Sequence, residues 1–277
     1  MKSLDNYLNR IGVSLEKPFK CNEATLATIM DGQSRSISFE NFDVVMKKTI
    51  SMKEEDVEAK LVDQKRGGYC WELNTLLRIA LEDIGYKKVT PLMCRVRWGK
   101  PDDSLEPNTA YTHLALKVET DDGRNLLADV GFAGSNSMAP VSMDVGDDPQ
   151  ELPEGRFRIV PSKHDGFHVL EVSVKEEWRP LYEWRDEHAP FVDQECSNWF
   201  SCTYPSARFT TQFFAHTIIG EERHYILNEK YFIRKGHGVD KEIKEEIIEV
   251  KSRLLELIDN VFGVELKETD DIDRYLQ

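Results

Sequence analysis

Residues 66–74 read Arg66-Gly67-Gly68-Tyr69-Cys70-Trp71-Glu72-Leu73-Asn74, and the rest of the chain is best understood from this stretch. The paired glycines predict a tight turn, and an apolar pattern with helical spacing begins directly after the cysteine. We therefore expect Cys70 at a helix N-terminus, where unpaired backbone N–H groups and the helix dipole favour a thiolate. Most cysteines are inert core residues instead, so the partners of Cys70 decide between the two interpretations.

The first 85 residues are predicted to be mainly helical. Ser3 and Asn22 are expected N-caps of two helices, and a third helix is expected from about Lys53 to Val62. The helix after Cys70 is expected to stop at Gly85. Its apolar positions are Leu73, Leu76, Leu77, Ala80, Leu81 and Ile84.

From Tyr86 to about Trp184 the sequence changes to short β-rich runs separated by turns. Residues 114–119 and 125–130 flank Asp121-Asp122-Gly123, which predicts a hairpin because glycine accepts the positive φ of such turns. Residues 157–160 and 168–174 flank a second turn at 164–166. Several antiparallel strands at this spacing predict a small barrel or a sandwich.

After Pro190 the pattern is mixed. Strand-like runs are expected at 224–227 and 231–233, followed by a final amphipathic helix. That helix is predicted to bury one face, formed by Ile243, Ile247, Val250, Leu254, Leu257 and Val261. The changes in pattern predict three parts: residues 1–85, 86–190 and 191–277.

The composition of the chain bears on its partners and on the compartment in which it works. The net charge is −14, with 50 acidic and 36 basic residues, which argues against nucleic acid as a partner. Five scattered cysteines without a CxxC pair favour a reducing compartment. The N-terminus lacks the apolar core of a signal peptide, and no apolar run is long enough for a membrane span. We expect a cytoplasmic protein with no membrane partner.

A reactive cysteine needs a histidine to hold its proton, and the histidine needs a carboxylate to orient it. His113 lies at the edge of one strand of the predicted hairpin, and Asp129 lies at the end of the other. Counting outward from a turn centred at residue 122 puts His113 opposite position 131, two residues from Asp129. Side chains this close on adjacent strands touch when they share a face.

Each residue also has a simpler interpretation. His113 alone would be a satisfied histidine at a strand edge, and Asp129 alone would cap a turn. Together with Cys70 they supply the nucleophile, the base and the orienting carboxylate of a catalytic triad, in the chain order Cys, His, Asp. That order does not separate a hydrolase from a transferase.

These residues resemble the arylamine N-acetyltransferase family. Residues 66–74 match its RGG-aromatic-C-x-E-x-N signature, and residues 38–43 (Ser-Phe-Glu-Asn-Phe-Asp) resemble its PFENLD element with Ser in place of Pro. Thr112-His113 and Asp129-Val130-Gly131-Phe132 are similar to its TH and DVGF elements. Residues 198–209 resemble its later N…S-x-P-x-S-x-x-F stretch.

The resemblance implies an α+β fold with an N-terminal helical bundle, a central antiparallel β-barrel and a C-terminal α/β lid, around a core like that of papain-type cysteine proteases. It implies acetyl-CoA as donor, no metal, and arylamines, arylhydrazines or aryl hydroxylamines as acceptors. Cys70 corresponds to the nucleophile, His113 to its base and Asp129 to the orienting carboxylate. Glu40 and Arg66 match a structural pair, so an ion pair is expected before Cys70.

The remaining site residues also come from the resemblance. CoA contacts are expected from Thr112, Gly131, Ser206, Arg208 and Phe209, although Arg208 could instead be solvated. Acceptor contacts are expected from Tyr69, Phe132 and Phe209. Each of these rings could equally be a core residue, and this is the simpler interpretation for Tyr69.

Besides the Ser that replaces Pro, further positions depart from the family pattern, and one of them is Ser36, where many members carry a basic or histidine residue. Ala133 replaces the last glycine of DVGFG, and Arg208 interrupts a run of small residues. These departures concern the cofactor contacts.

Two other functions stay open at this point. A papain- or transglutaminase-like thiol hydrolase or acyltransferase on peptide amides would share the three residues and ignore acetyl-CoA. A binding module with a degenerate site would lack a reactive thiol.

Overall fold

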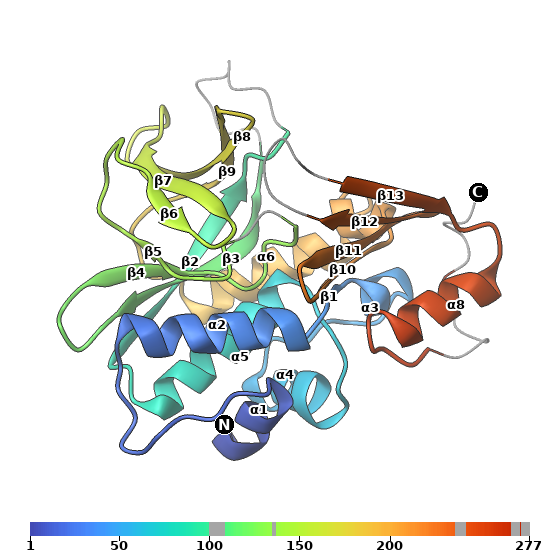
Figure 1. Cartoon of the computed structure of the whole chain (residues 1–277), viewed down its shortest axis with the longest axis horizontal. Coiled ribbons are helices and arrows are strands. Elements are labelled where there is room, and N and C mark those ends of the chain that lie inside the picture. Colours follow the sequence, from blue (N-terminus) through green and yellow to red (C-terminus); the bar gives the residue numbers. More distant parts are fainter. Residues whose placement is uncertain (100–108, 135–136, 236–241, 267–271, 273–277) are drawn as a thin grey trace.

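Helix α5 (Cys70–Ile84) is the central element of the helical layer in the computed structural model, which describes residues 1–99, 109–134, 137–235, 242–266 and 272 (Figure 1). It begins at Cys70 and is followed by Gly85, whose φ of 120° ends it. The predicted start and stop of this helix are both confirmed. Apolar side chains on several sides of α5 are almost completely buried, so the helix is held by packing more than by propensity.

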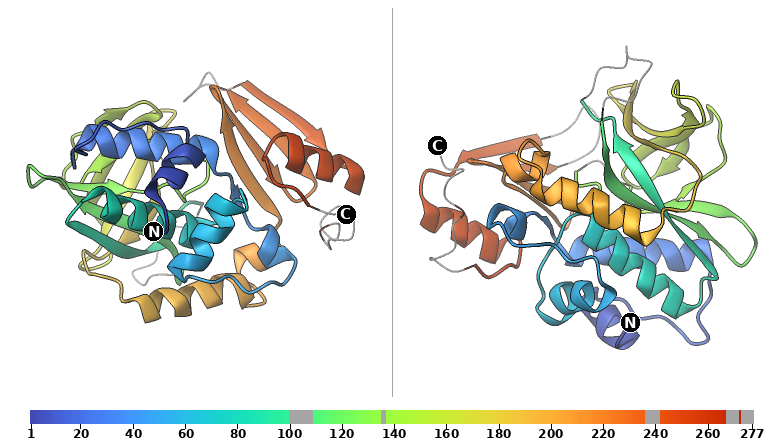
Figure 2. Two further views of the ribbon diagram at one scale, coloured as in Figure 1. Left: turned by 90° about the horizontal axis from the view of Figure 1, so that it is seen from below. Right: turned by 180° about the vertical axis from the view of Figure 1, so that it is seen from behind.

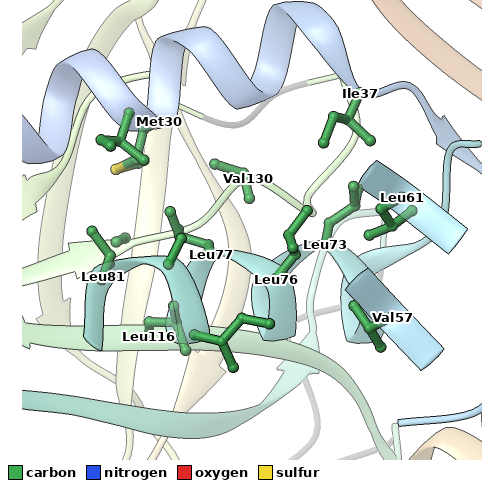
Figure 3. Close-up of a cluster of buried hydrophobic side chains, with 14 of the residues drawn as sticks. Met30, Ile37, Val57, Leu61, Leu73, Leu76, Leu77, Leu81, Leu116 and Val130 are labelled. Carbon is green, nitrogen blue, oxygen red and sulfur yellow. The ribbon is translucent and has the colours of Figure 1, made fainter. Parts of the chain in front are cut away.

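The other N-terminal helices surround α5. Helix α1 (Leu4–Arg10) is capped by Ser3, and α2 (Glu23–Ser36) is capped by Asn22, both as predicted. Helix α4 (Glu54–Glu58) continues as a π-helical turn, η1 (Ala59–Asp63). Figure 3 shows the resulting core, in which Leu77 of α5 lies between Met30 of α2 and Leu116 of the neighbouring sheet. Burying one such side chain contributes about 1.5–3 kcal/mol.

The middle of the chain forms an antiparallel sheet of eight strands in the order β5-β4-β3-β2-β9-β8-β7-β6. The strands are β2 (Lys88–Val96), β3 (Tyr111–Glu119), β4 (Asn125–Ala128), β5 (Val141–Ser142), β6 (Gln150–Leu152), β7 (Gly155–Pro161), β8 (His168–Val174) and β9 (Glu177–Trp184). The two edge strands meet through Gln150, whose side chain accepts from Ser142 N (2.7 Å) and donates to Ser142 O (3.0 Å). The sheet is therefore a nearly closed barrel.

The hairpin β3–β4 has the predicted register. Leu116 pairs with Ala128 and Glu119 pairs with Asn125, so the turn is centred at residue 122. Gly123 has a φ of 83°, as the turn requires. Continued past Ala128, this register places position 131 opposite His113, as expected from the sequence.

The C-terminal part forms a second antiparallel sheet in the order β1-β10-β11-β12-β13 (Figures 1 and 2). Its strands are β1 (Phe39–Glu40), β10 (Phe214–Ile219), β11 (Glu222–Leu227), β12 (Lys230–Lys235) and β13 (Glu242–Ile247). One face packs on α8 (Lys251–Asn260) through Ile226, Tyr231 and Leu254. Because β1 pairs with β10, the segment around residue 40 and the short helix α3 (Phe42–Val45) join the C-terminal core.

The predicted final helix is wrong over its first half. Residues 242–247 are strand β13, paired with β12, and the helix is limited to α8. Ile243 and Ile247 are exposed by 58% and 50%, so the apolar face expected there is not buried. The helical spacing of these isoleucines was overridden by the open edge of β12, which offers a full ladder of backbone hydrogen bonds.

Three helices were not predicted: the short α3, α6 (Phe191–Thr203) and α7 (Arg208–Thr211). Helix α6 lies along α5, where Trp71 Nε1 donates to Ser201 Oγ (3.3 Å) (Figure 2). The sequence boundary at residue 190 thus separates elements that touch, and the three-part division stays a prediction. None of the described helices has the length and apolarity needed to span a membrane.

Candidate active site

Close packing explains the two glycines before Cys70. A Cβ at Gly67 would lie 2.4 Å from Ser38 O, and the Gly68 backbone bonds to Ser38 O (3.2 Å) and Glu40 N (2.9 Å). Neither glycine has a positive φ. The sequence-based reason, backbone freedom in a tight turn, therefore needs correction: only glycine lets segment 38–40 approach this closely.

A buried network of charges supports the same turn. Arg66 Nη2 lies 3.1 Å from Glu40 Oε1 and 3.3 Å from Asp43 Oδ1, so the expected contact between Arg66 and Glu40 is present. Lys60 Nζ lies 2.9 Å from Asp43 and 2.7 Å from Glu72. Burial alone would raise the pKa of Asp43, but Lys60 and Arg66 lower it to about 2. Asp43 is thus held in its charged form beneath the start of α5.

His113 and Asp129 form a buried pair. His113 Nε2 lies 2.7 Å from Asp129 Oδ2, and the two residues are only 2% and 6% exposed. Burial alone would lower the pKa of His113, but the charge and hydrogen bond of Asp129 and the contact with the Cys70 thiol raise it to about 10. The imidazole is therefore mostly protonated at neutral pH, with Nδ1 left for the thiol.

Asn74 connects this pair to the helix of Cys70. Its Nδ2 donates to Asp129 Oδ1 (2.9 Å) and Leu114 O (2.7 Å), and its Oδ1 accepts from Val130 N (3.0 Å). Asn74 is fully buried and lies one helical turn after Cys70. One amide thus fixes the strand of His113, the carboxylate and the helix relative to one another.

Cys70 is the first residue of α5 and is 2% exposed. Its Sγ lies 3.6 Å from Thr112 O, on the residue before His113. Gly131 packs directly on it, because a Cβ at Gly131 would lie 2.7 Å from Cys70 Cα and 2.7 Å from Asn74 Nδ2. The Asp-Val-Gly segment therefore meets the start of α5 at a distance that only glycine permits.

Aromatic rings enclose the imidazole. Phe132 is edge-on to His113 at 5.2 Å between ring centroids, and Tyr182 lies at 4.8 Å. Tyr69 lies elsewhere: it is fully buried, its ring packs on Phe209 at 5.6 Å, and it is absent from the described lining of the cavity beside Cys70. The expectation that Tyr69 contacts the acceptor is thus not supported, because its hydroxyl is held in the core.

A cavity of about 790 Å³ opens beside Cys70, within the size range of small-molecule sites. The predicted site residues that line it are Cys70, Thr112, His113, Gly131, Phe132, Ser206, Arg208 and Phe209. Asp129 stands behind His113. The described residues include no cluster of three His, Cys, Asp or Glu side chains arranged to hold a metal ion.

Several residues of this site were not predicted from the sequence. The sequence does hold a signal for Asn74, because it is a polar residue within an apolar helical pattern, four positions after Cys70. Tyr182 and the cavity wall formed by β10–β12 carry no local signal, because pairing between distant strands brings them to the site. That wall is formed by Phe214, Tyr225, Leu227, Phe232 and Arg234.

Fold and site together define a class of protein: a mixed α+β chain in which a cysteine at a helix start faces a histidine–aspartate pair in a ligand-sized cavity. This arrangement suits nucleophilic chemistry at a thiol.

Comparison with known proteins identifies the family. An N-acetyltransferase family model matches residues 23–272. The arylamine N-acetyltransferase of Mycolicibacterium smegmatis is 33% identical over 264 residues, which cover 95% of this chain and 92% of that protein. The chain belongs to the arylamine N-acetyltransferase family and is an acyltransferase.

A further relative and two solved structures carry the name of the same family. A Salmonella typhimurium protein named arylamine N-acetyltransferase / N-hydroxyarylamine O-acetyltransferase is 30% identical, covering 86% of this chain and 81% of its own length. The solved M. smegmatis arylamine N-acetyltransferase superimposes with a TM-score of 0.88 at 31% identity, covering 99% of this chain and 97% of that one. The structure of the Mycobacterium marinum arylamine N-acetyltransferase in complex with CoA superimposes with a TM-score of 0.86 at 29% identity, covering 95% of this chain and 93% of that one.

Proposed function

We propose that the protein transfers acetyl from acetyl-CoA to aromatic amines, hydrazines or hydroxylamines in two half-reactions. The Cys70 thiolate attacks the thioester carbonyl, and the acetyl group moves to sulfur while CoA leaves as its thiol with a proton from His113. The amine nitrogen then attacks the acetyl-cysteine, and His113 takes the proton that the nitrogen loses. The thiolate is regenerated, so each acetyl group passes through Cys70.

The observation that carries this proposal is the geometry around His113. Asp129 lies 2.7 Å from its Nε2 and raises its pKa, so the imidazolium is available to stabilise a thiolate and to protonate the departing CoA. Backbone N–H groups near Cys70 are the candidate donors to the oxyanion.

The ligands are proposed from the relatives and the cavity. The M. marinum structure holds CoA, which supports CoA as the carrier of the acyl group here. We place Thr112, Gly131, Ser206, Arg208 and Phe209 at the CoA and Phe132 and Phe209 at the acceptor, because all of them line the cavity. Apolar rings favour an aromatic acceptor.

Two further proposals concern the architecture of the fold and the cellular location of the protein. We propose that the barrel and helices form a cysteine-protease-like core, with the five-stranded sheet and α8 as a lid. We also propose a cytoplasmic location, since all five cysteines are unpaired.

Initial-rate kinetics with acetyl-CoA and aniline test the mechanism. Double-reciprocal plots at several aniline concentrations should be parallel, and Cys70→Ala should abolish CoA release. Cys196→Ala is the matched control, because Cys196 is exposed on α6. Intersecting lines, or a Cys70→Ala variant that still transfers acetyl, would contradict the two-step mechanism.

A further inference from the structure

Two arginines face each other on the C-terminal sheet. Arg223 of β11 is directly paired with Arg234 of β12 (strands labelled in Figure 1). Side chains paired in this way have Cβ atoms about 5 Å apart, and like charges at this distance are destabilising. The pairing of Arg223 with Arg234 therefore lowers the stability of the sheet.

No carboxylate neutralises this pair among the described residues. On the same face, Glu245 of β13 pairs with Lys230 at 3.1 Å. Glu222 is adjacent in sequence, so it points to the other face, where it lies 3.6 Å from His224. Arg223 Nη1 and Arg234 Nε are buried atoms that have no hydrogen-bond partner.

The same positive charge acts on a neighbouring histidine. His216 of β10 pairs with Tyr225 and so lies on the face of the arginines. Burial, Arg223, His224 and Arg234 together hold its pKa well below the usual value. His216 is thus neutral at physiological pH and does not add to the charge of this face.

This face of the sheet is the wall of the active-site cavity. Strand alternation puts Arg223, Tyr225 and Leu227 on one side, and both Tyr225 and Leu227 line the cavity. Arg234 lines it directly. The described lining contains two arginines, Arg208 and Arg234, and no Asp or Glu, although the whole chain has a net charge of −14.

Aromatic rings hold one guanidinium in place. Tyr225 and Phe232 stack at 4.8 Å between centroids and 10° between planes. The Arg234 guanidinium carbon lies 5.1 Å from the first ring and 5.2 Å from the second. Cation–π contacts of this kind orient the group and leave its hydrogen-bond donors free for an anion.

We infer that Arg223 and Arg234 form an anion subsite that binds the phosphates of the acyl donor. The inference rests on the proposed function. A CoA thioester carries its reacting carbonyl at one end of a long arm and its phosphates at the other, and one cavity extends from Cys70 to Arg234. Two adjacent guanidiniums match phosphate oxygens in charge and geometry, and the bound anion removes the repulsion between them.

The test compares donors with and without phosphates. We would measure kcat/KM for acetyl-CoA and for p-nitrophenyl acetate, an acetyl ester without phosphate, in Arg223→Gln, Arg234→Gln and the double variant. Selectivity for acetyl-CoA should fall about tenfold in each single variant and about a hundredfold in the double variant, as expected for lost charged hydrogen bonds. Lys235→Gln is the control, since Lys235 is adjacent on β12 but exposed on the other face.

Thermal melts separate binding from a structural role. Without ligand, the single variants should melt at or above the wild-type temperature, because the repulsion between the arginines is relieved. The rise in melting temperature that CoA gives the wild type should be strongly reduced in the double variant.

Unchanged selectivity in a folded double variant of an enzyme that uses acetyl-CoA would overturn the subsite and leave the proposed function intact. Conversely, a wild type that is acetylated by p-nitrophenyl acetate and not by acetyl-CoA would overturn both.

Discussion

Asn74 Nδ2 donates a 2.9 Å hydrogen bond to Asp129 Oδ1, and this contact joins the helix of the nucleophile to the carboxylate behind His113. The same amide also binds the backbone on either side of the pair. The relative position of Cys70 and His113 thus depends on one buried side chain that does not touch the substrate cavity.

Replacing Asn74 should therefore reduce activity more than it reduces folding. We expect Asn74→Ala to lower the rate of acetyl transfer about a hundredfold, because misplacement of reacting groups by about 1 Å has effects of this size. Stopped-flow measurement of CoA release at saturating acetyl-CoA gives this rate, and near-ultraviolet circular dichroism is the control for folding. Asn125→Ala, at the exposed start of β4, should behave as wild type. A folded Asn74→Ala variant with wild-type rate would contradict the role of Asn74.

Gly131 should not accept any side chain. A Cβ there would lie 2.7 Å from Cys70 Cα, so Gly131→Ala must displace either α5 or the segment after Asp129. We expect a loss of about 1–3 kcal/mol in the free energy of unfolding, together with at least a tenfold loss of activity. Chemical denaturation and the aniline assay measure the two effects. Gly146→Ala is the control, because a Cβ at Gly146 meets nothing within 4 Å; equal stability of the two variants would refute the packing argument.

Arg66→Ala should lower the stability of the fold. Glu40 would lose its ion-pair partner while its side chain stays fully buried, a change that typically costs about 3 kcal/mol. Urea denaturation should show a lower midpoint and a reduced yield of folded protein. Arg124→Ala removes exposed ion pairs and should leave the midpoint nearly unchanged. Wild-type stability and activity in Arg66→Ala would rule out the structural role of the pair.

The pair of His113 and Asp129 should make stability depend on pH. The pKa of His113 is raised from 6.5 to about 10 in the folded state, so its contribution is complete below pH 6.5 and is lost as the pH rises towards 10. The difference in unfolding free energy between wild type and His113→Gln should therefore shrink by at least about 1 kcal/mol from pH 6 to pH 10. Denaturation curves at pH 6, 8 and 10 measure it, and a difference that is constant or grows with pH would show that the shift is absent.

Local signals were enough to predict much of this molecule. The caps at Ser3 and Asn22 and the stop at Gly85 are properties of one short segment each, and they are confirmed. The Asp-Gly turn sets the register of β3 and β4, and counting from that turn is enough to bring His113 near Asp129. Geometry that depends on a single turn or helix end can be worked out from sequence.

Contacts between distant segments could not be predicted in this way. The isoleucines of β13 have helical spacing, and only the open edge of β12 makes them a strand. Arg223 and Arg234 look like ordinary surface arginines until the pairing of β11 with β12 puts them face to face. Tyr69 follows the glycine turn in sequence, yet the packing of α6 places its hydroxyl in the core.

The most direct test of the mechanism is the mass of the intact protein after incubation with acetyl-CoA alone, followed by peptide mapping. We predict a single acetyl adduct on Cys70 that disappears when aniline is added, with no adduct in Cys70→Ala and a normal adduct in Cys196→Ala. A folded protein whose Cys70 is alkylated readily but gains no acetyl group would contradict the account and point to a thiol enzyme with another acyl donor.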